Sequence, residues 1–390
     1  MIIKNAKIYG EELKDIQILE GKITQIANGL HDNEEIIDAQ GLSVLPSFVD
    51  LNVNFKNDKF SLEHLDILEQ ECLKSGISSI VLRDKMDFEE ENYTLFLDRL
   101  KQMKIDVFSS IRVLDSNKKL KNLSTLVNKG ALGLELKSSS EANIVKLAMQ
   151  YALMKNVPIF VECYNEGFND GGVMNNSDIS FELGLVGMNA ISEYSEVAKM
   201  KQIAKFYNVE IIYDGLTLKN SLELLSEDDC ILASIHHLIK SDEACLGFNT
   251  AAKIFPPLRS KEDRDFLKQA LKKNKIKFLT SLHNPKSISL KDLAFDEAAF
   301  GIHGLCDFIS LCYTFFIKNG FLTWRELCKF TSKNPSEFLG LNSGIIEIGK
   351  EANLVIFDED EENFTPKGSL YANDKLFGKV KMHMIKGEMF

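Results

Sequence analysis

The sequence predicts an α/β fold in which a (β/α)8 TIM barrel carries a small β-sandwich built from both chain ends. Two patterns indicate this arrangement. Short strands and turns occupy the beginning and the end of the chain, whereas the long middle section alternates apolar strands with amphipathic helices. Repeated strand-helix units over so long a section are typical of a closed parallel barrel. The expected division is 1–48 for the first part of the sandwich, 49–341 for the barrel and 342–390 for the second part.

The individual elements follow from the local alternation of apolar and polar residues. In the barrel section, 77–82 and 158–161 are nearly continuous apolar runs, as strands buried on both faces require. Leu62, Leu65 and Leu68 lie at helical spacing and predict an amphipathic helix between strands. Short runs bounded by turn residues predict the strands of the first section at 2–3, 6–8, 15–18, 21–26 and 35–39.

The last section returns to strand-like sequence. Strands are expected within 344–358 and 378–388, and they would pair with those of the first section. The acidic stretch 358–362 is expected to be a solvated loop, because like charges in a short run repel one another.

Composition and charge exclude several classes of protein. The chain has 390 residues, 45% of them apolar, which is enough for a large core. No apolar run approaches the ~20 residues that a membrane span needs, so no membrane contact is expected. The formal charge is −11 and the 46 basic residues form no dense stripe, so nucleic acid is not an expected ligand. Seven scattered cysteines predict reduced thiols and a cytoplasmic location, while homo-oligomer formation stays open.

The segment 47–55 is expected to end the first barrel strand, and it carries two asparagines. Asn52 and Asn54 follow Asp50, and strand alternation points both amides to the same face. A carboxamide oxygen is a weak, neutral ligand for zinc, which prefers imidazole, thiolate or carboxylate. These two positions therefore offer no strong metal ligand.

A series of short motifs runs in order along nearly the whole chain. The motifs are GVMN at 172–175, LGLVGM at 183–188, HHL at 236–238, KIFPPLR at 253–259, EDR at 262–264, FDEAAFGIHGL at 295–305, NP at 334–335, LGL at 339–341 and the strand 349–358. In this order they resemble the dihydroorotases of the amidohydrolase superfamily, which cyclise carbamoyl aspartate in pyrimidine synthesis. The resemblance implies a barrel of the amidohydrolase type.

The same resemblance implies that the catalytic groups are missing. An active member carries histidines at the first strand, a bridging modified lysine or acid, further histidines after later strands, and a proton-accepting aspartate at the last strand. Leucine at that last position cannot accept a proton, so no catalytic residue is assigned. The degenerate positions are Asn52, Asn54, Glu135, Glu162 and Leu282.

Of the seven histidines, His237 and His283 are the remaining candidates for a metal ligand. His237 follows a predicted strand beside His236, and neighbours on one strand point to opposite faces, so only one of them can face the barrel. His283 lies one residue beyond the position of the missing aspartate, so it need not point where that aspartate did. No cofactor is expected unless a zinc site has been rebuilt. Its weak candidates are Glu135, Glu162, His237 and His283.

Substrate recognition is expected to differ as well. In the family that this chain resembles, an arginine and an asparagine hold the carboxylates of dihydroorotate. By the resemblance, Lys56 takes the position of the arginine and Lys85 lies near that of the asparagine. Lysine is a point charge without the two-pronged geometry of arginine. Phe255 replaces a polar residue and would reshape the pocket. The pocket candidates are Lys56, Lys85, His237, Phe255, His283, Asn284 and Lys286.

Three functions from different classes remain, and enzyme activity stays undecided. The first is a non-catalytic dihydroorotase homologue retained as a structural or regulatory partner of aspartate carbamoyltransferase, with which such inactive relatives assemble. A preserved barrel with an altered site favours it. The second is a divergent, metal-dependent cyclic amidohydrolase with a rebuilt site. The third is a module that binds a small anion through Lys56, Lys85 and Lys286.

Overall fold

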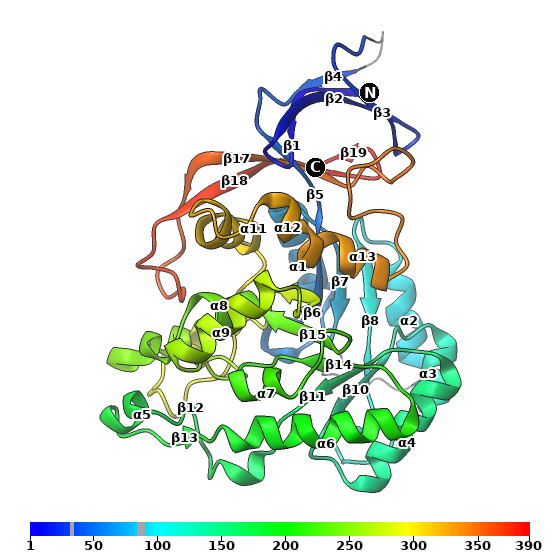
Figure 1. The fold of residues 1–390 in the computed structure, drawn as a ribbon. Helices are drawn as coiled ribbons and strands as arrows, with labels where there is room; N and C mark the ends of the chain where they lie inside the picture. Colours follow the sequence, from blue (N-terminus) through cyan, green and yellow to red (C-terminus); the bar gives the residue numbers. More distant parts are fainter. Residues whose placement is uncertain (32–34, 84–89) are drawn as a thin grey trace.

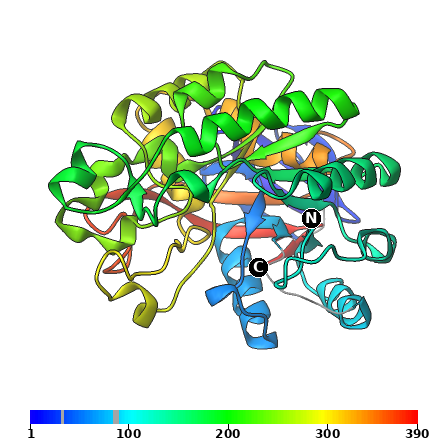
Figure 2. The same cartoon turned by 90° about the horizontal axis from the view of Figure 1, so that it is seen from below.

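The computed structural model describes residues 1–31, 35–83 and 90–390. A barrel lies below a curved sheet near which both chain termini are found (Figure 1). Seen from below, in Figure 2, helices lie around the central strands. The predicted (β/α)8 barrel is therefore confirmed, and the strands of both chain ends, expected to form a small β-sandwich, pair in one curved sheet.

The barrel consists of a three-stranded and a six-stranded parallel sheet that meet between β6 and β16. Strands β8 and β9 are two parts of one barrel strand, which is interrupted at Ser110. Strands β6, β7 and β16 are buried along their whole length and β11, β14 and β15 along most of it, which explains their largely apolar sequences. The strands are β6 (Phe48–Val53), β7 (Ile77–Leu82), β8 (Asp106–Ser109), β9 (Ile111–Arg112), β10 (Leu134–Lys137), β11 (Ile159–Glu162), β14 (Ile211–Asp214), β15 (Cys230–Ser234) and β16 (Phe278–Thr280).

The arrows of β7 and β8 in Figure 1 point away from the curved sheet. The carboxyl ends of the parallel barrel strands therefore lie on the side opposite that sheet. In barrels of this kind, ligands bind at the carboxyl ends of the strands. A binding site is therefore expected on that side of the barrel.

The helices connect successive strands and cover the barrel wall. They are α1 (Leu62–Ser75), α2 (Glu90–Leu100), α3 (Leu123–Lys129), α4 (Ala142–Lys155), α5 (Asp178–Glu182), α6 (Ile191–Tyr207), α7 (Lys219–Glu223), α8 (Ile235–Ile239), α9 (Lys261–Lys272), α10 (Ile288–Lys291), α11 (Phe308–Cys312), α12 (Trp324–Cys328) and α13 (Asn334–Phe338). Among the helices of the described residues, none has the length and apolarity needed to cross a bilayer. Shorter 3-10 and π segments are η1 (Lys56–Asp58), η2 (Glu166–Phe168), η3 (Asp242–Phe248), η4 (Thr250–Ala252), η5 (Tyr313–Ile317) and η6 (Lys329–Lys333).

Helix α1 shows why the sequence forms these elements. The Ser61 side chain accepts a hydrogen bond from the backbone N–H of His64 and so caps the amino end. Gly76 ends the helix with a φ of 74°, a left-handed conformation that favours glycine. Leu65 and Leu68 are buried against the barrel, as their spacing predicts.

The curved sheet joins the two chain ends. Its eight strands follow the order β19-β18-β17-β5-β1-β2-β3, with β4 paired to β1. Strands β5 and β17 pair with each other and so join the first section of the chain to the last one. The boundaries expected at 48/49 and 341/342 stay predictions. The remaining strands are β1 (Ile2–Ile8), β2 (Glu12–Leu19), β3 (Lys22–Ala27), β4 (Ile36–Asp38), β5 (Ser43–Pro46), β12 (Met174–Asn175), β13 (Gly187–Met188), β17 (Leu354–Asn363), β18 (Leu376–Ile385) and β19 (Glu388–Met389).

The acidic stretch 358–362 belongs to strand β17, so the expected loop is wrong. Glu361 forms ion pairs with Lys379 and Lys381 of the neighbouring strand β18, at 2.9 and 2.7 Å. These lysines hold the pKa of the Glu361 carboxyl below its usual value through hydrogen bonds. Opposite charges across a strand pair remove the repulsion on which the loop expectation rested.

The barrel closes between β6 and β16, and Asp50 is the centre of this seam. Its fully buried carboxylate accepts hydrogen bonds from the Thr280 hydroxyl at 2.5 Å and from the Ser281 backbone N–H at 2.9 Å. The backbone N–H of Asn54 donates to the His283 carbonyl at 2.7 Å, and Val53 pairs with His283. The seam therefore fixes the residues after β16 relative to those at the end of β6.

Replacement of Asp50 tests this account of the seam. Asp50→Ala should lower the free energy of unfolding by about 3 kcal/mol, because buried donors on Thr280 and Ser281 lose their acceptor. Asp50→Asn is the matched control, since it keeps the shape and one acceptor oxygen, and its loss should be smaller. Urea denaturation measures both. Equal stability of Asp50→Ala and the unchanged protein would contradict a structural role for this carboxylate.

Candidate functional site

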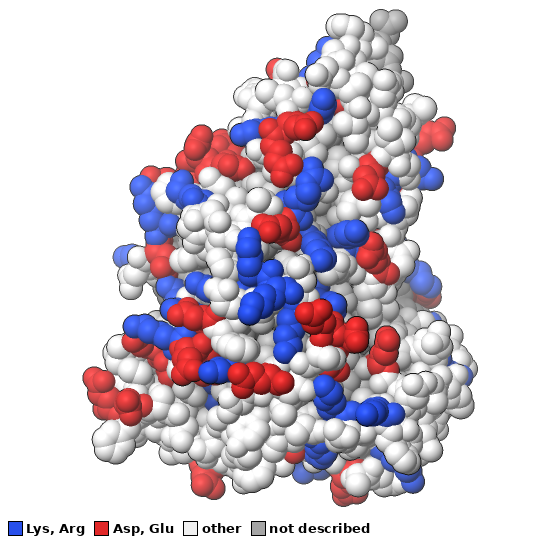
Figure 3. All heavy atoms as spheres, in the orientation of Figure 1, with Lys and Arg blue, Asp and Glu red and all other residues white. Residues whose placement is uncertain are grey.

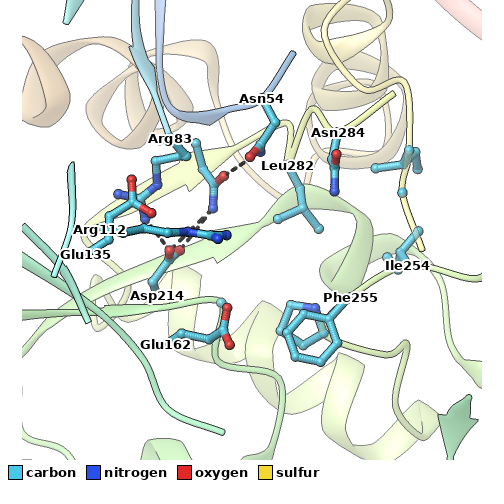
Figure 4. A pocket seen from close by; sticks show the side chains of 15 residues that line it. Asn54, Arg83, Arg112, Glu135, Glu162, Asp214, Ile254, Phe255, Leu282 and Asn284 are labelled. Atoms are coloured by element: carbon cyan, nitrogen blue, oxygen red, sulfur yellow. Dashed lines mark hydrogen bonds and ion pairs between the residues drawn. The ribbon is translucent and has the colours of Figure 1, made fainter. Parts of the chain in front are cut away.

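A small pocket lies at the carboxyl ends of the barrel strands (Figure 4), with a cavity volume of about 150 Å³. Sites for small molecules commonly enclose about 300–1,000 Å³, so this space is tight. The lining residues are Asn52, Asn54, Arg83, Arg112, Glu135, Glu162, Asp214, Gly215, Ile254, Phe255, Pro256, Leu282, Asn284, Gly301 and Ile302. All five degenerate positions named from the sequence thus meet in one place, together with Phe255 and Asn284.

An ion pair between Arg83 and Asp214 lies at the centre of the pocket. Only 4% of the Arg83 side chain and 16% of the Asp214 side chain are exposed. The guanidinium carbon of Arg83 lies 3.9 Å from the centroid of the Phe160 ring, which supports the cation from the barrel interior. A protein cation is therefore fixed against this carboxylate.

The two asparagines continue the same network. Asn52 Nδ2 donates to Asp214 Oδ1 at 3.2 Å, and Asn54 Nδ2 donates to Asn52 Oδ1 at 3.3 Å. Among the described residues, neither Arg83 Nη1 nor Asn54 Oδ1 has a hydrogen-bond partner. The network therefore leaves one buried donor and one buried acceptor for a further small polar molecule.

The remaining carboxylates are already engaged. Glu135 accepts a hydrogen bond from the Ser110 hydroxyl. Glu162 lies 3.6 Å from the Lys137 ammonium, and this negative charge is the main cause that raises the Lys137 pKa.

The donor set of the pocket does not fit a divalent metal ion. Two lining amides are neutral and weak ligands, Asp214 is paired with a guanidinium, and no histidine lines the pocket in the described part of the chain. An arginine keeps its positive charge at neutral pH, because its pKa is far higher, so it does not release a carboxylate to a metal by losing a proton. These residues therefore do not support a metal-dependent chemical step at this place.

The structure turns the candidate histidines away from this pocket. His236 and His237 lie on the short helix α8, not on a strand, and both are buried in the core. His236 Nε2 donates to the Ser281 carbonyl at 2.8 Å, and His237 Nε2 donates to the Pro256 carbonyl at 2.9 Å. His283 points to the outer side of the barrel wall, where its Nε2 lies 3.7 Å from Glu71.

Lys56 and Lys286 do not line the pocket either. Lys56 is exposed on η1, and Lys286 forms an ion pair with Asp58. Lys85 lies outside the described residues, as does Asp84.

The sequence interpretation missed Arg83, Arg112 and Asp214 as site residues. Arg112 and Asp214 are the last residues of β9 and β14, and Arg83 directly follows β7. A charged residue at the carboxyl end of a buried barrel strand was the signal that could have identified each of them.

Phe255 closes one side of the pocket with other aromatic rings. Its ring centroid lies 4.9 Å from that of Tyr164 and 6.0 Å from that of Phe300, both in edge-to-face geometry. Such contacts stabilise an apolar wall where the resemblance implies a polar contact to substrate.

The fold and the position of this pocket define a barrel of the amidohydrolase class. The family model described as "Amidohydrolase family" matches residues 191–390, and the chain belongs to that family. A dihydroorotase of Elusimicrobium minutum is 30% identical over 97% of this chain and 93% of its own length. A probable dihydroorotase-like protein of Helicobacter pylori is 29% identical over 100% of this chain and 97% of its own length. The resemblance to dihydroorotases is therefore confirmed.

Solved structures agree on the fold. The L-hydantoinase (dihydropyrimidinase) from Arthrobacter aurescens superimposes with a TM-score of 0.85 at 19% identity, covering 100% of this chain and 95% of its own. A dihydroorotase from Campylobacter jejuni gives a TM-score of 0.65 at 16% identity, covering 87% of this chain and 97% of its own. At such low identity these structures support the architecture alone.

Breaking the central ion pair should destabilise the protein. Arg83→Met leaves Asp214 buried without its partner, and we expect a loss of about 3 kcal/mol in the free energy of unfolding. The double variant Arg83→Met/Asp214→Leu should recover at least half of this loss, because the uncompensated charge is gone. Lys101→Met, which removes an ion pair of largely exposed side chains, serves as the control and should change stability by less than about 0.5 kcal/mol. A single variant as stable as the control would contradict a buried pair.

Acid should destabilise the fold through its buried histidines. Burial lowers the pKa of His236 to about 3 and those of His237 and His383 to about 4. The unfolded chain takes up these protons first as the pH falls below about 6.5, so each histidine should reduce stability by up to about 1.4 kcal/mol per pH unit until its folded pKa is reached. Urea denaturation between pH 7 and 5 measures the slope, and His383→Gln should reduce it. A stability independent of pH in this window would refute the prediction.

Proposed function

We propose that this chain is a non-catalytic dihydroorotase homologue that serves as a structural or regulatory partner of aspartate carbamoyltransferase. The observation that carries the proposal is the Arg83–Asp214 ion pair, joined by Asn52, at the centre of the barrel mouth. In that position an active dihydroorotase would need metal ligands and a bound metal ion that water can reach. A guanidinium has no open coordination site and does not lower the pKa of water as a bound metal does.

The position of Leu282 supports the same conclusion. Its side chain lines the pocket where the resemblance implies a proton-accepting aspartate. Hydrolysis or cyclisation of an amide requires a group that takes up and returns a proton within hydrogen-bond reach of the reacting atoms. An isobutyl side chain cannot do this, and it also removes space from a cavity of about 150 Å³.

The names of the relatives support a place in pyrimidine metabolism. The matches extend over nearly the whole chain, and they include proteins named dihydroorotase as well as proteins named dihydroorotase-like. A barrel kept at full length while its site has changed is what a retained binding partner requires. Seven free cysteines, five of them buried, support a cytoplasmic location.

Charge distribution supports a protein partner over a nucleic acid. On the face shown in Figure 3, basic and acidic side chains lie interspersed. The formal charge of −11 adds a net repulsion from phosphate backbones.

The first test is enzymatic. Untagged protein, supplied with zinc or manganese, is assayed with dihydroorotate and with carbamoyl aspartate, and an active dihydroorotase is the positive control. We expect no turnover above the rate without protein. Metal-dependent turnover that Glu135→Gln or Glu162→Gln abolishes would overturn the proposal and establish a rebuilt amidohydrolase site.

The second test addresses the partner. The chain is mixed at micromolar concentration with the aspartate carbamoyltransferase of the same organism and analysed by size-exclusion chromatography with light scattering. We expect co-elution in a complex of defined stoichiometry. Separate elution would remove the partner role while leaving the lack of catalysis intact.

Binding of a small anion in the pocket is the second candidate function. The observation that favours it is the buried Arg83 Nη1, which has no partner in the described part of the chain, close to the second lining arginine, Arg112. Carbamoyl aspartate or phosphate should then raise the melting temperature, and Arg112→Gln should remove the shift. An unchanged melting temperature would exclude these anions.

A further inference from the structure

A second polar cluster lies on the outer side of the barrel wall, away from the pocket. It combines Glu71 of helix α1 with His283, which follows β16, and with His303 and Cys306 of the segment before α11. The ligand atoms of Glu71, His283 and His303 all lie within 4.8 Å of one another. The cluster therefore joins three parts of the chain that are far apart in sequence.

Two glycines allow the 301–306 segment to approach the barrel this closely. A Cβ at Gly304 would lie 2.1 Å from the Ser281 carbonyl oxygen, and one at Gly301 would lie 2.3 Å from the Asn284 carbonyl oxygen. Both distances are far below any tolerable contact, so a larger residue would push the segment outward. His303 lies between the two glycines and is placed beside His283 by this approach, with ring centroids 5.0 Å apart.

Three separations between these side chains are close to those around a tetrahedral zinc ion. His303 Nε2 lies 3.0 Å from Glu71 Oε1, His283 Nε2 lies 3.7 Å from Glu71 Oε2, and Cys306 Sγ lies 3.7 Å from His303 Nε2. Bonds of about 2.0–2.3 Å from zinc to nitrogen, oxygen and sulfur place neighbouring tetrahedral ligands about 3.3–3.7 Å apart. Glu71, His283 and His303 already lie close enough to share one ion, whereas the exposed Cys306 side chain would have to rotate to bring its thiol to the same ion.

The chemistry of the donors also selects a metal. Two imidazoles, one carboxylate and one thiol are the types that zinc binds, and a thiol argues against calcium or magnesium, which prefer oxygen. The His283 side chain is only 2% exposed, whereas that of His303 is 49% exposed. The cluster therefore has a fixed inner side and an open outer side through which an ion can enter.

We propose that Glu71, His283, His303 and Cys306 form a zinc site that ties helix α1 to the segment before helix α11. Four protein ligands leave no open position for substrate, so the site is structural. It is separate from the barrel mouth, because Leu282 lines the pocket while the adjacent His283 lies in the cluster. The inference does not depend on the proposed function.

Zinc binding has a defined proton balance. His283 Nδ1 accepts a hydrogen bond from the Leu305 backbone N–H at 3.3 Å, so Nε2 carries the proton in the metal-free state. When His283 binds zinc through Nε2, this proton moves to Nδ1 and the contact with Leu305 opens. His303 Nε2 gives up the proton that it donates to Glu71, and Cys306 loses its thiol proton to solvent, so binding releases protons and weakens as the pH falls.

The experiment uses the full chain without a histidine tag, stripped with a chelator and then titrated with zinc or cobalt. We expect one bound ion per chain, a thiolate-to-cobalt charge-transfer absorption band, and a higher melting temperature with zinc. Cys306→Ser should remove the charge-transfer band, and His303→Gln should weaken zinc binding at least tenfold. The cysteine control is Cys230→Ser, since Cys230 lies at the start of β15 rather than in the cluster, and it should keep the band.

A barrel-mouth variant distinguishes this site from a rebuilt catalytic site. Glu135→Gln/Glu162→Gln should keep one bound ion and the full zinc-induced rise in melting temperature. The proposal would be overturned if zinc binding is lost in this variant, if it is retained in both cluster variants, or if the unchanged protein binds no zinc. Circular dichroism of each metal-free variant confirms that the comparison is made between folded proteins.

Discussion

The closure of the barrel between β6 and β16 determines both polar centres of this molecule. Asp50 binds Thr280 and Ser281, and the Asn54 backbone binds the His283 carbonyl, so the chain after β16 is held in one position. On one side of this chain Leu282 enters the pocket with Asn52 and Asn54. On the other side His283 meets Glu71 and His303. One set of hydrogen bonds thus fixes the pocket and the outer cluster together.

The electrostatics of the pocket follow from the same geometry. A carboxylate at the end of β14 needs a positive partner when it is buried, because desolvation of an isolated charge is costly. A divalent metal can meet this need and also activate water. Arg83 meets only the first requirement: it compensates Asp214 and stacks on Phe160, but offers nothing that creates a nucleophile. The exchange of an open-coordinated ion for a guanidinium would therefore preserve the stability of the barrel mouth while removing its chemistry.

Local patterns predicted the architecture and part of the site, but not the contacts made across the barrel. Alternation and helix spacing indicated the barrel, and strand periodicity placed Asn52 and Asn54 on one face, where the structure has them. The Arg83–Asp214 pair joins residues 131 positions apart, and no local pattern specifies such a partner. His237 follows strand β15 as predicted, but it lies on helix α8, which buries it in the core instead of directing it into the pocket. The acidic stretch in β17 likewise became a strand because lysines on β18 compensate it, which only the tertiary pairing reveals.

Leu282 shows that the seam maintains the backbone independently of catalysis. Its φ is 51°, a left-handed conformation that is unfavourable for a residue with a branched apolar side chain. The conformation persists because the Leu282 N–H donates to the Thr280 hydroxyl at 2.9 Å, and Thr280 itself is bound to Asp50. Strained backbone of this kind is usual at functional sites, where the surrounding structure imposes it. The side chain at this position can therefore vary while the local backbone stays, because the restraint comes from the barrel closure.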